Sequence, residues 1–163
     1  MPIASGSASP LFLREAEVRR GLELLFFGYG GLMRRLDARL AEDRLGRAHQ
    51  RALYFIARQP DASVGTLLGL LGVTKQSLGR TLGELETRGL IALRPGRDDR
   101  RQRLVRLTPE GAAIEAELFE LLRAALAEAY VNAGASAVGG FWQVLEGLVP
   151  AEARTRVATL LRS

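Results

Sequence analysis

The chain has 163 residues, of which 47% are apolar and 25% charged, a composition that suits one globular domain with a buried core. It contains no cysteine, which excludes disulfides, thiolate metal sites and thiol redox switches, so we expect a protein of a reducing compartment, the cytoplasm. The net charge of +5 favours a polyanionic partner, although Lys75 is the only lysine and an excess of arginine can also reflect a GC-rich genome.

The first ten residues, MPIASGSASP, lack the basic and apolar regions of a signal peptide, and we expect them to form a disordered tail. No uncharged apolar run reaches the ~20 residues that a membrane span requires. We therefore expect no membrane partner.

From about 11 to 42, apolar residues recur at steps of three and four and predict one long amphipathic helix. Glycines at 28, 30 and 31 each cost about 1 kcal/mol inside a helix, so packing must hold this segment or the helix bends there. Close approach of another helix would explain these glycines. The apolar stripe consists of Leu22, Phe26, Tyr29, Met33, Leu36 and Leu40.

A second helix is predicted over 47–58, ahead of Pro60, and Asp61 and Ser63 can cap the helix that follows. Residues 63–89 then predict two short helices joined by a tight connection at 72–74. Gly89 suits the position just after the second of these helices. That helix leaves a donor-rich set off its apolar stripe, as a helix in the major groove needs for phosphates and base edges. The set consists of Lys75, Gln76, Ser77, Arg80 and Thr81, with Thr74 as the N-cap, and Gln76 and Arg80 are the expected base readers.

Residues 90–94 and 103–108 predict two short antiparallel strands, separated by the arginine-rich tip GRDDRRQ. This order is typical of a winged helix-turn-helix that binds double-stranded DNA. The charge distribution agrees, because 63–111 holds nine Lys/Arg against five Asp/Glu, a net +4, whereas 112–163 holds four against six, a net −2.

Thr108, Pro109 and Glu110 predict the start of a long helix that runs to about Tyr130. A loop near 132–136, an apolar helix and a last short helix after Pro150 should follow. We expect the terminal helices to form a homodimer interface, and the alternative is that they pack on their own domain. The residues expected to face inward are Ile114, Leu118, Leu121, Leu122 and Ala125, then Phe141, Trp142, Val144 and Leu145, then Val157, Leu160 and Leu161.

From about 22 to 161 the chain resembles the MarR family of transcriptional regulators. The similar stretches are LGRAHQRALYFI, TKQSLGRTLGELETRGLI and above all DRRQRLVRLTPEG at 99–111. The resemblance implies a homodimer, repression as the default, and often a small ligand between dimer and DNA lobes. It also implies that Asp99 braces the wing, that Arg101 enters the minor groove, and that Arg100 or Arg97 contacts phosphates. A wing that only follows the phosphates is the alternative. KQS at 75–77 together with RAHQRALYFI is also similar to the PetP branch of this family.

A ligand site is predicted less sharply. His49, the only histidine, could form a pocket for a small aromatic or anionic ligand with Tyr29, Arg51 and Tyr54. A satisfied structural histidine is favoured over this pocket. One histidine and no cysteine disfavour a zinc site, so we expect no metal and no cofactor. No catalytic triad or phosphate-binding glycine loop is present, so we expect no enzyme.

The predicted fold is therefore mainly α with a small β-hairpin wing. Residues 1–10 would be the tail and 11–163 a single domain, with dimerisation helices at 11–46 and 112–163 and the winged helix-turn-helix DNA-binding lobe at 47–111. The predicted function is that of a homodimeric, sequence-specific DNA-binding transcriptional regulator acting on a palindromic operator. The alternative is a dimeric protein-interaction module that keeps the winged fold and has no specific operator.

Overall fold

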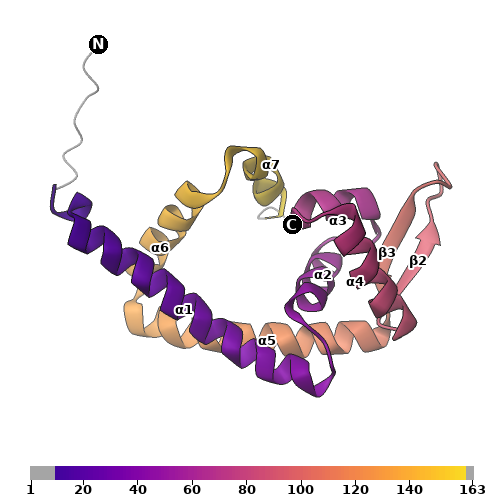
Figure 1. The fold of residues 1–163 in the computed structure, drawn as a ribbon, viewed down its shortest axis with the longest axis horizontal. Helices are drawn as coiled ribbons and strands as arrows, with labels where there is room; N and C mark the ends of the chain where they lie inside the picture. Colours follow the sequence, from indigo (N-terminus) through magenta and orange to yellow (C-terminus); the bar gives the residue numbers. More distant parts are fainter. Residues whose placement is uncertain (1–9, 161–163) are drawn as a thin grey trace, which may run out of the picture. The chain divides into compact units, whose positions relative to one another are not determined.

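A computed structural model of the protein describes residues 10–160. The predicted fold class is confirmed, because the described chain is mainly helical with one small sheet (Figure 1). None of the helices in this range is long and apolar enough to cross a membrane. The elements are η1 (Pro10–Leu13), α1 (Glu15–Glu42), α2 (Arg47–Arg58), β1 (Ala62–Ser63), α3 (Val64–Leu71), α4 (Lys75–Thr87), β2 (Ile91–Pro95), β3 (Arg103–Leu107), α5 (Pro109–Ala133), α6 (Ala135–Leu148) and α7 (Ala151–Leu160).

The chain divides into two compact units within α1, after Arg35. The first unit contains η1 and most of α1, which runs unbroken through the glycines at 28, 30 and 31. A Cβ atom at Gly28 would meet nothing within 4 Å, and one at Gly30 would meet only the Arg34 side chain, at 3.6 Å. The close approach of another helix at these glycines stays a prediction. From the predicted stripe, Leu22, Phe26 and Tyr29 are exposed.

The second unit, from Leu36 onward, holds a core built around α2. This helix packs against α3, α4, α5 and β3, because its apolar side chains at 52, 53 and 56 are all buried. The last two residues of the predicted α1 stripe, Leu36 and Leu40, are buried as well. The largest side chains that are less than 2% exposed are Leu36, Leu40, Leu53, Ile56, Leu67, Leu78, Leu85, Val105 and Leu118.

Side-chain caps begin three helices of the second unit. The hydroxyl oxygens of Ser63, Thr74 and Thr108 accept hydrogen bonds from backbone N–H groups three residues later, at 3.0, 3.2 and 3.1 Å. These predicted caps are confirmed, as is the left-handed conformation of Gly89, with φ of 69°. Asp61, which was predicted as a cap together with Ser63, does not cap α3: its carboxylate pairs with arginines of the sheet instead.

The sheet is antiparallel, with β3 between β1 and β2. The predicted hairpin is confirmed with nearly the predicted bounds, and Ile91 pairs with Leu107 and Pro95 with Arg103. Figure 1 shows β2 and β3 projecting beyond the helices of the lobe as a wing. The strand β1 was not predicted from the sequence, and it contributes only two residues, paired with Val105 and Leu104.

The C-terminal helices differ in detail from the prediction. α5 continues past Tyr130 to Ala133, and only Gly134, with φ of 84°, separates it from α6, so the predicted loop at 132–136 is wrong. A glycine that adopts positive φ turns the chain within one residue. Leu118 is buried as predicted, but the other predicted inward residues of α5 are only half-buried, and Phe141, Trp142 and Val144 of α6 are exposed.

The last helix, α7, begins after Pro150 as predicted and reaches α3 through the Arg156 side chain, which donates to the carbonyl oxygen of Gly69. Val157 and Leu160 are half-buried. Leu161 and residues 1–9 of the expected disordered tail lie outside the described residues.

Candidate nucleic-acid interface

The first candidate surface is the exposed face of α4. Lys75, Gln76, Ser77 and Arg80 are exposed, while the leucines at 78, 82 and 85 are buried. Thr81 does not belong to this face. Its side chain is 8% exposed and its hydroxyl donates to the Ser77 carbonyl at 3.1 Å, so the prediction that it lies off the buried stripe is wrong.

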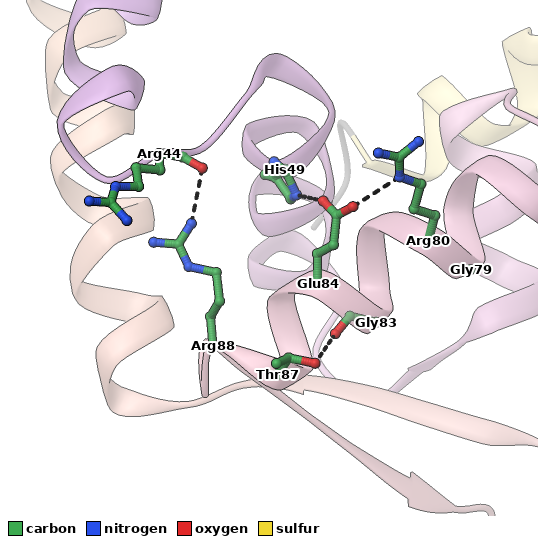
Figure 2. Close-up of a pocket in the computed structure, with 8 residues that line it drawn as sticks. All are labelled: Arg44, His49, Gly79, Arg80, Gly83, Glu84, Thr87 and Arg88. Carbon is green, nitrogen blue, oxygen red and sulfur yellow. Dashed lines mark hydrogen bonds and ion pairs between the residues drawn. The ribbon is translucent and has the colours of Figure 1, made fainter.

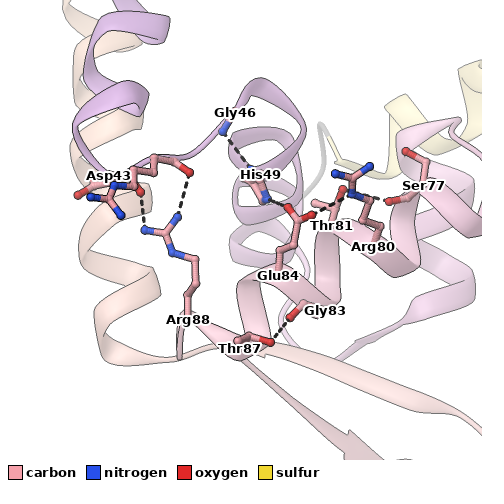
Figure 3. A network of polar contacts seen from close by, with 11 residues as sticks. Asp43, Gly46, His49, Ser77, Arg80, Thr81, Gly83, Glu84, Thr87 and Arg88 are labelled. Atoms are coloured by element: carbon pink, nitrogen blue, oxygen red, sulfur yellow. Dashed lines mark hydrogen bonds and ion pairs between the residues drawn. The ribbon is translucent and has the colours of Figure 1, made fainter.

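A chain of hydrogen bonds ties the middle of α4 to the start of α2 (Figure 3). The Arg80 Nε donates to Glu84 Oε1 at 2.9 Å, and His49 Nε2 lies 2.7 Å from Glu84 Oε2. The Gly46 N–H donates to His49 Nδ1 at 3.0 Å. Because Nδ1 accepts that bond, the proton of the neutral ring is on Nε2, which therefore donates to Glu84.

These hydrogen bonds settle the role of His49. Both His49 ring nitrogens are bonded, and the ring occupies the capping-box position at the start of α2, so the structural alternative for this residue is confirmed. The guanidinium of Arg80, followed by the His49 ring, lowers the pKa of the Glu84 carboxyl. Glu84 thus stays ionised between two donors.

Beside these hydrogen-bonded residues lies an open depression of about 430 Å³ (Figure 2). Two of its cations are already engaged: Arg80 with Glu84, and Arg88 with the carbonyl oxygens of Asp43 and, at 3.1 Å, Arg44. The depression is lined by Arg44, His49, Gly79, Arg80, Gly83, Glu84, Thr87 and Arg88.

Of the predicted ligand residues, only His49 lines this depression. Arg51 donates to the Leu71 carbonyl at 3.2 Å, and the Tyr54 ring packs on Phe55 and Phe119, with ring centroids 5.3 and 6.4 Å apart. Tyr29 belongs to the first unit and is 61% exposed. Arg51 and Tyr54 therefore do not share this depression with His49.

The second candidate surface is the tip of the wing. The Asp99 Oδ1 accepts the backbone N–H of Arg101 at 2.9 Å, and the Asp99 carbonyl accepts that of Gln102 at 3.0 Å. A Cβ atom at Gly96 would lie 2.6 Å from the same carbonyl oxygen, so this tight turn needs glycine there. The turn holds the tip in one shape. Across residues 10–160, Arg97, Arg100 and Arg101 are exposed and their side chains have no hydrogen-bonding or ion-pair partner.

The base of the wing carries a cluster of charged side chains that was not predicted from the sequence. The Asp61 carboxylate contacts Arg94 of β2, with Nη2 to Oδ1 at 2.8 Å, and Arg106 of β3, with Nε to Oδ1 at 3.1 Å and Nη2 to Oδ2. The Arg106 guanidinium, together with Arg94, lowers the pKa of Asp61. No sequence signal marks this cluster, because its residues come together only through the pairing of β1 with β3.

No group of three or more His, Cys, Asp or Glu side chains in the described part of the chain could hold a metal ion. The chemistry that the two surfaces offer is hydrogen-bond donation and positive charge. The helix pair α3–α4 followed by the β2–β3 wing defines a winged helix-turn-helix protein.

Comparison with known proteins places this fold in a family. A sequence model described as MarR family matches residues 45–102. The HTH-type transcriptional regulator PetP of Rhodobacter capsulatus is 46% identical over 146 residues, which cover 90% of this chain and 88% of that protein. The chain therefore belongs to the MarR family of transcriptional regulators. These relatives are regulators and not enzymes, and the predicted family and its PetP-like similarity are confirmed.

Solved structures give the same result. A mutant of MarR from E. coli, complexed with operator DNA, has a TM-score of 0.67 and 26% identity, covering 87% of this chain and all (100%) of that chain. Wild-type MarR from E. coli in its apo form has a TM-score of 0.61 and 26% identity, covering 78% and 96%. A MarR-family regulator from Rhodococcus shares the fold, with a TM-score of 0.66 at 18% identity, covering 83% and 96%.

Proposed function

We propose that this protein is a homodimeric repressor that binds a palindromic operator, with α4 in the major groove and the wing tip at the minor groove. The observation that carries the proposal is the free state of the wing arginines. Arg97, Arg100 and Arg101 are exposed and unpaired over the whole described range, on a tip that Asp99 holds in shape. A cationic tip that is already held in one shape loses little conformational freedom when it binds DNA. The E. coli MarR mutant complexed with operator DNA supports the same reading of the lobe.

The first turn of α4 would contact phosphates. Its N-cap Thr74 precedes Lys75, Gln76 and Ser77, all exposed, and a helix N-terminus attracts anions through its unpaired N–H groups and its dipole. Gln76 can also read adenine through its amide group. This turn would thus set the register of α4 on the duplex.

Arg80 would read a base one turn further along. Its Nε donates to Glu84, which orients the guanidinium and leaves both Nη groups available. Those two groups can pair bidentately with O6 and N7 of guanine. The side chain is 83% exposed, so it reaches solvent without rearrangement of α4.

Arg101 would enter the minor groove, where a narrow A·T-rich segment attracts inserted cations. Arg97 and Arg100 would contact the flanking phosphates, which add affinity but no sequence preference. Asp99 would act on these contacts through the tip conformation alone, because its Oδ1 is bonded to the Arg101 backbone.

Dimerisation would address the two halves of a palindrome, whose centres lie ~34–36 Å apart. The apolar side chains left exposed by a single chain support this part of the proposal. They lie on α1 (Leu22, Leu24, Phe26, Phe27 and Tyr29) and on α6 (Trp142, Val144 and Leu148).

A small anionic ligand would act at the depression beside α4. Such an anion would compete with Glu84 for the Arg80 guanidinium and so change the side chain that reads the base. Titration of the protein–operator complex with an aromatic carboxylate tests this. Arg80→Ala binds the operator more weakly at the start, but the carboxylate should reduce its operator affinity by a smaller factor than it reduces that of the wild type.

The test of the proposed function is fluorescence anisotropy with the protein's own upstream DNA and a scrambled duplex over a salt series. Arg101→Ala should lower operator affinity at least about tenfold, in the ~1–3 kcal/mol range of a lost specific contact, and flatten the salt dependence. Arg154→Ala is the matched control, since it removes one positive charge outside the winged helix. Equal, weak binding of both duplexes that neither variant changes would instead favour the protein-interaction module.

A further inference from the structure

The arginines of the wing fall into two groups. At the base, Arg94 and Arg106 are bonded to Asp61. At the tip, Arg97, Arg100, Arg101 and, at the first position of β3, Arg103 have exposed side chains with no polar partner anywhere in 10–160. The two groups therefore differ in that the arginines of the base are paired with the Asp61 carboxylate and those of the tip are not.

Asp61 is placed to hold all three strands together. It immediately precedes β1, and its own N–H donates to the carbonyl oxygen of Val105 on β3 at 3.0 Å. From there its carboxylate bonds Arg106 on the same central strand and Arg94 on the outer strand β2. Its side chain is only 25% exposed, whereas the two arginines are about half exposed, at 49% and 59%. The aspartate is thus the enclosed member of the cluster.

We propose that Asp61 positions the wing for DNA and withholds Arg94 and Arg106 from the phosphates, so that only the tip arginines, including Arg103, carry the wing's charge to the duplex. This inference rests on the proposed DNA-binding function. Its physical reason is that phosphate contacts supply non-specific affinity in proportion to the number of cations engaged. An internal carboxylate that occupies two of them would lower binding to random DNA without removing any base contact.

Asp61→Asn is the decisive variant. Asp61 has a left-handed backbone, with φ of 61°, and asparagine tolerates this conformation, so the turn into β1 is kept while the charge is removed. Half-exposed ion pairs contribute little to stability, so the variant should fold. Freed Arg94 and Arg106 should then steepen the slope of log affinity against log salt on scrambled DNA by about 0.9 for each phosphate they contact. Because the looser wing also positions its tip less well, the operator preference over scrambled DNA should fall several-fold.

Asp98→Asn is the matched control. Asp98 lies in the same wing, is exposed, and has no ion-pair or hydrogen-bonding partner within the described residues. The substitution changes net charge by the same amount without freeing an arginine, so its slope should stay close to that of the wild type. Identical slopes for the two variants would overturn the proposal, because Asp61 would then act only as one more surface charge.

Two arginine variants test whether the arginines of the base and those of the tip differ in their contacts with DNA. Arg106→Ala should leave the salt slope unchanged, because the withheld cation contributes no phosphate contact, and should lower the operator preference. Arg103→Ala should flatten the slope by about 0.9. If Arg106→Ala flattens the slope as much as Arg103→Ala does, Arg106 contacts DNA and the proposal is wrong.

A measurement without DNA separates this inference from the proposed function. Hydrogen exchange over 91–107 should be faster in Asp61→Asn than in the wild type or in Asp98→Asn, because the strands lose their shared tie. Faster exchange in Asp61→Asn, together with a wild-type protein that does not bind its upstream DNA, would retain the positioning role of Asp61 and overturn the DNA-binding function. Unchanged exchange would overturn the positioning role, whatever the protein binds.

Discussion

At the scale of single residues, Gly111 controls how α5 meets the end of the helix-turn-helix. A Cβ atom at this position would lie 1.9 Å from the Leu90 carbonyl oxygen, a backbone atom that also accepts the N–H of Thr108. Neither side can yield without breaking the junction between β2, β3 and α5. We expect Gly111→Ala to destabilise the protein at the upper end of the ~1–3 kcal/mol typical of overpacking, or beyond it. Urea unfolding followed by circular dichroism measures this loss.

Gly83→Ala is the control for that prediction. Gly83 lies in α4 of the same lobe, and an added Cβ there would meet nothing within 4 Å. Alanine in an open helical position should raise the free energy of unfolding by about 0.5–1 kcal/mol. A loss at Gly83 equal to that at Gly111 would show that glycine at 111 is not required by the close approach to Leu90.

At the scale of the elements, His49 joins α2 to α4. Its Nδ1 caps the Gly46 N–H at the start of α2, and its Nε2 bonds Glu84. His49→Ala should cost about 1 kcal/mol, the usual effect of losing a helix cap. His49→Gln should recover most of this loss, since glutamine at the same position of a capping box accepts that N–H. The midpoints of urea unfolding, at an unchanged dependence of the free energy on urea concentration, compare the two variants. Equal losses in His49→Ala and His49→Gln would show that the bond to Glu84, and not the cap, carries the stability.

Local signals of this kind explain which elements could be predicted from the sequence. α2 has the predicted bounds, and the helices after Ser63, Thr74 and Thr108 begin where those hydroxyls predict, because a cap and an apolar period are both properties of a short segment. β1 could not be predicted, since two residues show no alternation and its existence depends on β3. The one-residue junction at Gly134 was missed because Asn132, Gly134 and Ser136, so close together, are equally typical of a loop.

The candidate site divides in the same way. The exposure of Lys75, Gln76, Ser77 and Arg80 follows from helical spacing on α4, and the resemblance supplied the wing arginines. Thr81 was misplaced, because a threonine can bury its methyl group and satisfy its hydroxyl on the preceding turn. The Asp61 cluster and the His49–Glu84 bond join residues that are distant in the sequence, so spacing carries no information about them.

At the scale of the whole molecule, the exposed apolar side chains of α6 make the proposed dimer testable. Val144 is 62% exposed in the single chain, so a charge there costs the folded monomer little, whereas the same charge inside an apolar interface would be buried without a partner. We expect Val144→Glu to shift the protein from twice its 17.7 kDa chain mass toward the monomer in sedimentation velocity, with its circular dichroism spectrum unchanged. Operator affinity should fall with it, because one lobe alone holds half of a palindrome.

Gln143→Glu supplies the matched comparison, since it introduces the same charge at the neighbouring exposed position of α6. Its mass and operator affinity should stay those of the wild type. If Val144→Glu and Gln143→Glu both remain dimeric, the exposed face of α6 around Val144 is not the interface, and the apolar side chains of α1 become the surface to test next. A wild-type protein that sediments at the chain mass would instead remove the dimer, and with it the palindromic operator, from the proposed function.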